Sequence, residues 1–350
     1  MTIDTATFES EVENRSEIVF LYDAEDTNPN GNPLSGNNRP RVDEDSGQAE
    51  VTVYRLKRYL RDQLYDDNKN NDDEGVYLVA PNKAGIDPSS RDELFLELLD
   101  KSADEVSDME SLELFDAFLN AAADVRYFGA PLSFSGDVQD ALDDRSPAFT
   151  GPVQFDHGRS LNEVVRNDES RKLSVTVTSG DDEDGNGPQQ GTFAEDNRLR
   201  YALIRFHGVV NENAADNTQL RPEDVERLDT LCWRALRNQT LTNSKMGHSP
   251  RLYLRVEFEP NYHEGHLDAL VDIDRDASEP DAEMRNISHV VLDISKLLDR
   301  LSEIDHRIVS INVHADQYIT VDTGDGPTDR NDFYERLEDI AETNVIDVYD

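Results

Sequence analysis

Residues 15–65 combine an apolar strand pattern with a basic helical pattern, and this pair limits the folds open to the chain. Residues 18–22 read Ile-Val-Phe-Leu-Tyr, an unbroken apolar run that predicts a central strand buried on both faces. Residues 28–38 hold two prolines, two glycines and five asparagines, a composition typical of a structured loop. A helix is predicted to follow from Val53, with Thr52 as its N-cap.

The predicted helix has an apolar face with a basic arc beside it. At about 100° per residue, the apolar face collects Val53, Leu56, Leu60 and Leu64. The adjacent arc collects Tyr54, Lys57, Arg58, Arg61 and Tyr65. Residues 51–61 contain four basic residues and no acidic one, although the chain carries a formal charge of -41. This local reversal indicates either a bound polyanion or a solvated polar face, and the helix alone does not separate the two.

The overall charge admits two interpretations. The 350 residues include 75 Asp and Glu against 34 Lys and Arg, an excess that by itself argues against binding to nucleic acid or anionic membranes. However, the acids are dispersed along the chain and Arg outnumbers Lys, which suggests adaptation to a cytoplasm of molar salt. Because the Debye length falls to about 3 Å at 1 M salt, local basic patches then indicate more about ligands than the total charge does.

The order of predicted elements favours an α+β fold. Strands are predicted at residues 172–178, 199–207 and 252–258, and a helix at 223–238. If the intervening segment 66–165 is an insertion, the order becomes β-α-β-β-α-β, the ferredoxin-like order that RNA-recognition domains also use. The polar stretch 179–191 separates two strands and predicts a protruding flap.

Less regular patterns cover the rest of the chain. The insertion is predicted to hold a short strand at residues 76–79 and helices at 91–102 and 107–125. The C-terminal part is predicted to hold a helix at 286–304, a strand at 308–313 and a last helix near 334–342.

Two later patches also depart from the acidic background. Arg198 and Arg200 follow the predicted flap, and the acid-free loop 242–251 contains Ser244, Lys245 and His248. Side chains of these types and backbone N–H groups are the donors that phosphate oxygens accept from. A plain turn between helix and strand is the alternative for the loop, but three basic patches in one acidic chain together favour nucleic acid.

The sequence offers no chemistry of the common enzyme classes. Walker, Gly-x-Ser-x-Gly and His-Glu-x-x-His motifs are absent, and Cys232 is the only cysteine, which excludes intrachain disulfides and cysteine-rich zinc sites. Residues 182–187 match the first half of a calcium loop, but Phe193 stands where the bidentate Glu is needed. We therefore expect no catalytic residue and no cofactor.

His263 and His266 have the spacing of one helix face, yet Pro260 and Gly265 predict a turn there. This favours ordinary loop histidines, and we expect no metal site. Residues 1–14 are too polar for a signal peptide, and no apolar run approaches about 20 residues. We expect a soluble, cytoplasmic protein without a membrane partner.

Five segments in order make the sequence recognisable. Residues 28–33 read Asn-Pro-Asn-Gly-Asn-Pro, 55–58 Arg-Leu-Lys-Arg, 124–129 Asp-Val-Arg-Tyr-Phe-Gly, 150–154 Thr-Gly-Pro-Val-Gln, and 243–256 Asn-Ser-Lys-Met-Gly-His-Ser-Pro-Arg-Leu-Tyr-Leu-Arg-Val. Over about residues 15–258 the series resembles the backbone subunit of Cascade, the type I-B CRISPR interference complex (the Cas-seven family, Csh subtype). With the acidic composition, the resemblance suggests a halophilic archaeon as the source.

The resemblance implies a hand-shaped subunit. A modified RRM-like, ferredoxin-like palm would cover residues 15–65 and 170–258, with a finger insertion at 66–165, a thumb hairpin at 179–200 and a C-terminal extension at 259–350. Two features depart from the family pattern. The stretch 181–184 is more acidic than the thumbs of the family, and the aromatic RNP1 motif is absent.

The resemblance also implies partners and contacts. The subunit would polymerise with copies of itself along crRNA, pair the guide with a target DNA strand, and contact a guide-end capping subunit, a guide-processing endonuclease and a large subunit. With the basic patches, it predicts these RNA-binding residues: Asn30, Gly31, Arg39, Arg41, Thr52, Tyr54, Lys57, Arg58, Arg61, Arg198, Arg200, Ser244, Lys245 and His248.

Two other functions stay open at this point. Relatives in the broader superfamily cleave guide precursors, so the chain could be an RNA endonuclease, with His248 as the histidine within a basic patch. It could also be an acidic scaffold that binds no RNA.

Overall fold

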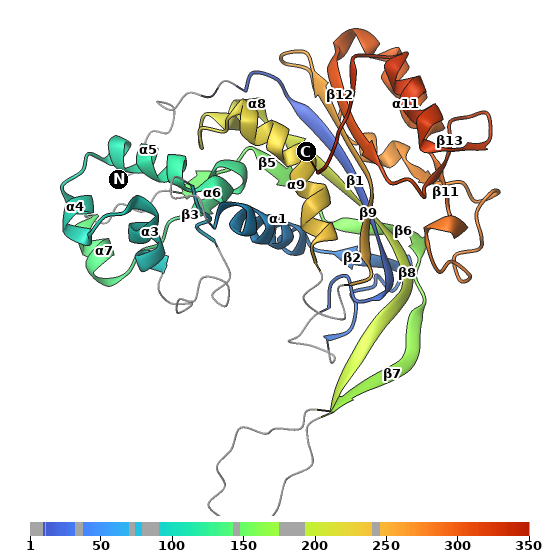
Figure 1. Ribbon diagram of the computed structural model, residues 1–350, viewed down its shortest axis with the longest axis horizontal. Coiled ribbons are helices and arrows are strands. Elements are labelled where there is room, and N and C mark those ends of the chain that lie inside the picture. The colour runs from blue at the N-terminus through green and yellow to red at the C-terminus, as the bar shows by residue number, and fades with distance from the viewer. Residues whose placement is uncertain are drawn as a thin grey trace, which may run out of the picture.

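The computed structural model describes residues 10, 12–31, 38–69, 74–78, 91–142, 148–174, 193–239 and 246–349. Within these residues a nine-stranded sheet follows the path β15-β12-β9-β1-β8-β6-β2, with β5 and β7 also paired to β8 (Figure 1). The central strand β1 (Ser16–Thr27) pairs antiparallel with β8 (Phe193–Val210) and with β9 (His248–Phe258). The remaining strands are β2 (Gln48–Val51), β5 (Val153–Phe155), β6 (Gly158–Glu163), β7 (Arg166–Ser174), β12 (Ile308–Ala315) and β15 (Thr343–Val345).

Both faces of β1 are buried, as its unbroken apolar run predicts. Ile18 and Phe20 belong to one core with α1 (Val53–Asn68) and α9 (Pro222–Arg237). Val19 and Leu21 belong to a second core formed with the C-terminal part of the chain. All four side chains are 0% exposed, because successive residues of a strand point to opposite faces and each face is covered.

The described residues between α1 and β5 build a helical unit with its own aromatic core, far from the C-terminal part in Figure 1. Its elements are α3 (Arg91–Leu99), α4 (Ala103–Ser107), α5 (Ser111–Ala121), α6 (Ala123–Phe128), β3 (Gly129–Pro131), α7 (Gly136–Ala141) and β4 (Ala148–Thr150). The helix predicted at 107–125 is wrong as one element. Gly75 bonds to the backbone of Ala121 and Ala123, and the helix breaks at Ala122.

The strand predicted at 76–79 is also wrong within its described part, residues 76–78. The amides of Tyr77 and Leu78 donate to the carboxylate of Asp124, at 2.7 Å and 3.1 Å, rather than to a neighbouring strand. A side-chain acceptor 46 residues further along the sequence thus replaces the strand partner that the local pattern implied.

The C-terminal part covers the second face of the large sheet. Its elements are η3 (Leu267–Leu270), β10 (Asp272–Ile273), η4 (Ile287–His289), β11 (Val291–Asp293), α10 (Ser295–Glu303), η5 (Asp305–Arg307), β13 (Thr320–Asp322), β14 (Pro327–Thr328) and α11 (Arg330–Glu338). The helix predicted at 286–304 is wrong in its first half. Residues 291–293 pair with β13, which lies outside any local window. The last helix begins and ends four residues earlier than predicted.

Strands β7 and β8 project from the body of the protein as an antiparallel pair (Figure 1). The strand predicted at 172–178 therefore starts earlier than expected, at Arg166. The predicted flap at 179–191 and the partial calcium loop at 182–187 lie outside the described residues. Among the helices that the structure describes, none is long and apolar enough to cross a membrane.

Candidate nucleic-acid interface

Hydrogen bonds from the loop after β1 fix the start of α1. The Asn30 side-chain oxygen accepts from the backbone N and the Oγ1 of Thr52, at 3.4 Å and 3.1 Å. Thr52 Oγ1 in turn accepts from Arg55 N at 3.4 Å, so Thr52 is the N-cap, as predicted. Gly31 bridges to Pro40, and a Cβ at Gly31 would overlap the side chain of Asn38. The loop composition thus serves close packing at the helix N-terminus.

The three bases of the predicted arc have different environments. Arg61 Nε bonds to the fully buried carboxylate of Asp124 at 2.9 Å. Arg58 pairs with Asp62 at 2.8 Å on the same helix and is 40% exposed. Lys57 Nζ donates to the neutral side-chain oxygen of Gln154 at 2.8 Å. Arg61 therefore holds two elements together, whereas Lys57 and Arg58 lie where a ligand can reach them.

Lys57 is also partly desolvated. Its Nζ lies 5.2 Å from the centroid of the Phe128 ring, and Arg61 Cζ lies 5.1 Å from the same ring. Burial, reinforced by the nearby charge of Arg61, lowers the pKa of Lys57 to about 8. An anion close to Nζ would favour the charged amine, so the position suits a phosphate oxygen.

Residues 124–129 lock the helical unit to both helices that cover the sheet. Asp124 binds Arg61 of α1, and Arg126, 1% exposed, binds both carboxylate oxygens of Asp224 in α9 at 2.8 Å and 2.9 Å. Tyr127 OH donates to the Asp224 backbone oxygen at 2.6 Å. Gly129 has φ 68°, and a Cβ there would overlap the backbone oxygen of Phe149. The segment therefore sets the position of α1 relative to its neighbours.

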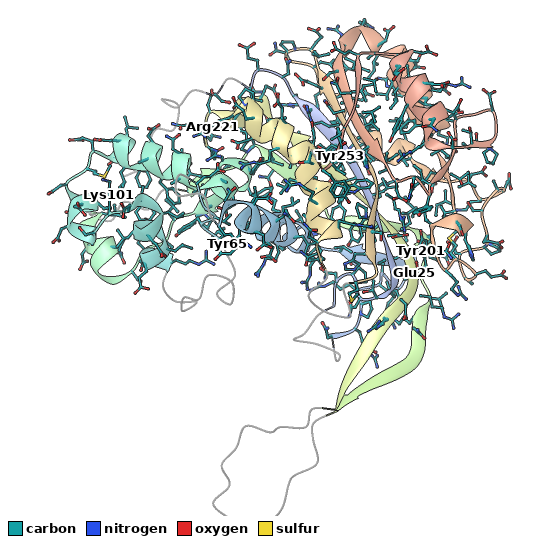
Figure 2. The ribbon with its side chains drawn as sticks, in the orientation of Figure 1. Glu25, Tyr65, Lys101, Tyr201, Arg221 and Tyr253 are labelled. Carbon is teal, nitrogen blue, oxygen red and sulfur yellow. The ribbon has the colours of Figure 1, made fainter. Side chains whose placement is uncertain are left out.

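Three segments that are distant in the sequence meet where β1 ends. Arg198 Nη1 donates to the backbone oxygen of Asp26, and Glu25 N donates to the backbone oxygen of Gly247, each at 2.9 Å. Figure 2 shows Glu25 beside Tyr201 of β8, close to where β7 and β8 leave the sheet, and these two residues are paired in the strand register. The loop containing Asn30 begins at the same end. The described parts of the three predicted basic patches, at Thr52, Arg198 and Gly247, thus lie around the end of β1 and the loop that follows it.

Residues 14–295 match the family model described as CRISPR-associated protein Cas7. The chain belongs to the Cas7 family. A CRISPR-associated protein Cas7 from the halophilic archaeon Haloferax volcanii is 42% identical over 352 residues, which cover 96% of this chain and 98% of that protein. The resemblance seen in the sequence is thereby confirmed at the family level, and the relative's source agrees with the acidic composition.

Solved structures of CRISPR RNA-guided surveillance complexes contain chains of comparable extent. One, from a complex described as pre-nicking, is 11% identical with a TM-score of 0.49 and covers 95% of this chain and 97% of its own length. A second is 11% identical with a TM-score of 0.47, at 95% coverage of both chains.

Most of the predicted RNA-binding residues of this Cas7-family chain surround the end of β1 or the start of α1. Arg39 and Arg41 are exposed, and Tyr54 is 77% exposed on the first turn of α1. Arg198 is only 5% exposed, with its guanidinium turned to Asp26. Arg200 N bonds to Val165 O at 2.9 Å. Ser244 and Lys245 lie outside the described residues.

His248 lies inside the protein rather than on the surface. It is 4% exposed, and its ring packs edge-on against Tyr22 at 5.5 Å and lies 6.2 Å from Tyr59. The buried imidazole packs between two tyrosines, where β1, β9 and α1 meet.

Sequence reasoning missed two neighbours of the helix. His157 Nδ1 accepts from Val53 N at 3.0 Å, and its ring lies 6.4 Å from that of Tyr54. Gln154 accepts from Lys57. Gln154 does end one of the five recognisable segments, which could have drawn attention to it, but no local pattern links residues 97 positions apart.

Proposed function

We propose that this chain is a non-catalytic backbone subunit of an RNA-guided CRISPR complex of type I-B. In this proposal it polymerises along crRNA, binds the RNA backbone and presents the spacer for pairing with target DNA. Membership of the Cas7 family supports the proposal. The observation that carries it is the meeting of the loop after β1, Arg198 of β8 and Gly247 at one end of the sheet, beside a helix whose Lys57 contacts a neutral amide.

The arrangement of the central strands supports an RRM-like palm. The order β9-β1-β8-β6 is antiparallel throughout, with α1 and α9 contributing to the core on one face, as in a ferredoxin-like domain. We assign residues 15–65 and 170–258 to the palm, 66–165 to the fingers, 179–200 to the thumb and 259–350 to a C-terminal extension.

Phosphate recognition explains the choice of residues. Lys57, Arg58 and the exposed Arg39 and Arg41 offer charge, while the loop at Asn30 and the N-terminus of α1 offer a fixed backbone. Contacts of this kind hold RNA without reading its sequence, and base pairing then supplies specificity.

Salt makes neighbour contacts necessary. Each phosphate contact weakens as salt rises, so one subunit should bind weakly in a salt-rich cell. Copies bound side by side on one RNA restore affinity through effective concentration. The further partners we propose are a target DNA strand, a guide-end capping subunit, a guide-processing endonuclease and a large subunit.

The endonuclease alternative has less support. His248, the candidate general base, is 4% exposed and packed between aromatic rings, where it cannot reach a substrate without rearrangement. If the wild-type protein and the His248→Ala variant leave a guide precursor uncut, the non-catalytic assignment holds. Cleavage by the wild type that is lost in the variant would replace it.

Copurification of short RNA tests the proposal directly. The protein is purified from its host in molar KCl, and bound RNA is extracted and sequenced. We expect a discrete set of guide-length RNAs, reduced about tenfold or more by Lys57→Ala with Arg58→Ala, because charged contacts to phosphate are lost. The control combines Lys296→Ala with Arg285→Ala on the C-terminal part, which removes the same charge elsewhere. Equal RNA recovery from both double variants would refute the assignment of the helix.

A further inference from the structure

Two histidines lie against a buried carboxylate at the other end of the sheet. Glu17 of β1 is 0% exposed and lies 3.3 Å from His207 Nε2 and 3.2 Å from His263 Nδ1. It also accepts hydrogen bonds from the backbone of Gly265 and Leu267. The segment before η3 therefore wraps around Glu17. Along β1, nine residue positions separate Glu17 from Asp26 at the basic patches, or about 30 Å of extended strand.

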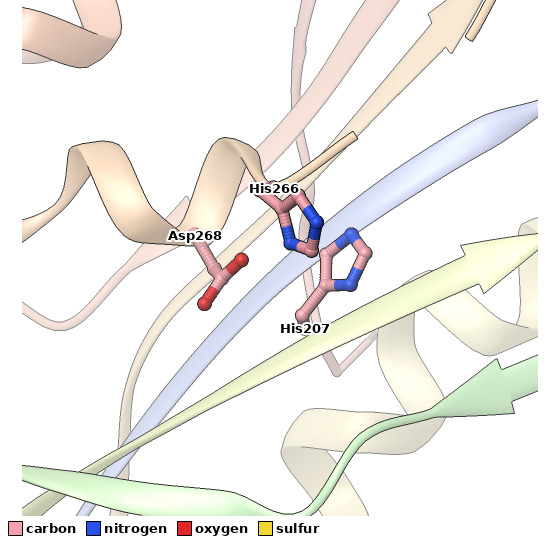
Figure 3. Close-up of side chains that lie close together, drawn as sticks. All are labelled: His207, His266 and Asp268. Atoms are coloured by element: carbon pink, nitrogen blue, oxygen red, sulfur yellow. The ribbon is translucent and has the colours of Figure 1, made fainter. Parts of the chain in front are cut away.

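Strand β8 and the segment at η3 bring potential ligand atoms together. His207, on β8, faces His266 and Asp268 at the start of η3, as Figure 3 shows, and one potential ligand atom from each lies within 4.8 Å of the other two. The rings of His207 and His266 have centroids 5.7 Å apart. His266 has φ 64°, a left-handed conformation that non-glycine residues rarely adopt. The backbone thus holds an exposed imidazole against a partly buried one.

The charge of the cluster suits a divalent cation. The cluster holds three carboxylates, those of Glu17, Asp156 and Asp268, and one guanidinium, that of Arg205. The Arg205 guanidinium lies 3.1 Å from one oxygen of Asp268. A carboxylate can accept that contact with one oxygen and bind a cation with the other. The net formal charge of these four groups is -2.

We propose that His207, His266 and Asp268 bind a zinc ion that ties the C-terminal part to the central sheet. Zinc takes imidazole nitrogens at about 2.0–2.1 Å and carboxylate oxygens at about 2.0–2.2 Å, so tetrahedral ligands lie about 3.3 Å apart. In the structure the three candidate ligand atoms lie within 4.8 Å of one another, and zinc binding would draw them to that spacing. Glu17 stands beside His207 as the carboxylate that orients a ligating imidazole.

The donor set distinguishes zinc from the abundant ions of a salt-rich cell. Two imidazoles and one carboxylate suit zinc and related transition metals, whereas Mg²⁺ and Ca²⁺ prefer shells of oxygen. Because the ligands come from β8 and from a segment 59 residues later, a bound ion would stabilise the packing of η3 against the sheet. Ligand binding raises the melting temperature in proportion to the logarithm of the free ion concentration.

Zinc binding by the full-length, tag-free protein tests this site. The protein is treated with a chelator, dialysed into molar KCl, and titrated with ZnCl2 by calorimetry and thermal unfolding. We expect one zinc per chain and a melting temperature raised by about 4 °C at a hundredfold excess over Kd. MgCl2 at the same concentration should leave the melting temperature unchanged.

Two variants and one control locate the ion. His266→Ala removes an exposed ligand, so it should fold normally and lose the zinc response, while His306→Ala, at an exposed histidine of η5, should keep it. Asp268→Asn can still accept from Arg205, and it should weaken zinc binding at least tenfold, which provides a second test if His266→Ala is unstable. Absence of saturable zinc binding by the wild type, or a response in His266→Ala equal to that of the wild type, would overturn the proposal.

Discussion

The contacts of Arg126 give a prediction about how the helical unit is held to the sheet. Its guanidinium makes two bonds to Asp224, at 2.8 Å and 2.9 Å, and two more to the backbone oxygens of Leu119 and Asn120, both at 3.0 Å. It also contacts Glu74. Replacement by Met keeps much of the volume but removes every donor, so the full set of contacts is tested at once.

The expected loss of stability follows from these contacts. Removing one partner of a buried ion pair destabilises by about 3–5 kcal/mol. The lower end applies here, because Asp224 keeps Arg227 at 2.7 Å and the amide of Arg221 at 3.2 Å. The two abandoned backbone oxygens add about 1 kcal/mol between them after relaxation. Arg126→Met should therefore destabilise by about 4 kcal/mol and lower the melting temperature by about 5 °C.

Trp233 is the only tryptophan of the chain and is buried in α9, the helix that carries Asp224. Its fluorescence during denaturation in molar KCl therefore reports the unfolding of the partner helix directly. Arg58→Ala is the control, since an exposed i,i+4 pair on a helix contributes less than about 0.5 kcal/mol. A loss below about 1 kcal/mol in Arg126→Met would refute the idea that residues 124–129 lock the unit to α9.

Three further predictions concern single groups. RNA binding should weaken as pH rises through about 8, because burial and Arg61 lower the pKa of Lys57 to about 8 and the amine loses its charge above that pH. The Lys57→Arg variant should bind RNA with little dependence on pH. A wild-type affinity independent of pH from 7 to 9 would contradict this prediction. Gly129→Ala should destabilise the protein by at least about 2 kcal/mol in thermal unfolding. Gly136→Ala is also at positive φ but has open space around it, so it should destabilise less. Equal losses of stability in the two variants would contradict the steric argument. Burial raises the pKa of the Cys232 thiol, so a thiol reagent should react only after unfolding, and rapid reaction of the native protein would show that α9 opens.

Elements with strong local patterns could be predicted from the sequence. The apolar run at Ile18 gave β1, and the four-residue spacing of Leu56, Leu60 and Leu64 gave α1 with its buried face. These predictions succeed because burial of a strand or helix face leaves a period in the same short window. The helix predicted across residues 291–293 failed because parallel pairing with β13 decides the conformation there, and no local window contains that partner.

The candidate site could be predicted only in part from the sequence, for the same reason. The basic residues of α1 were visible as a charge reversal, but the partners of Lys57 and Arg61 lie 97 and 63 residues further along the chain. Their identity decides which charge is available to a ligand. His266 likewise read as an ordinary loop histidine, because His207 is brought to it only by the packing of η3 on β8.

The acidic composition affects how each basic residue of the chain should be interpreted. In a chain with 75 acids, an arginine finds a carboxylate readily, and Arg61, Arg126 and Arg255 do so inside the protein. Counting bases on a helix face therefore overstates the charge offered to RNA. Lys57, held by a neutral amide and partly desolvated, keeps its charge uncompensated at close range. If high salt screens all but close contacts, such residues should determine most of the RNA affinity. Replacing Lys57 should therefore reduce RNA affinity more than replacing any paired arginine on the same helix.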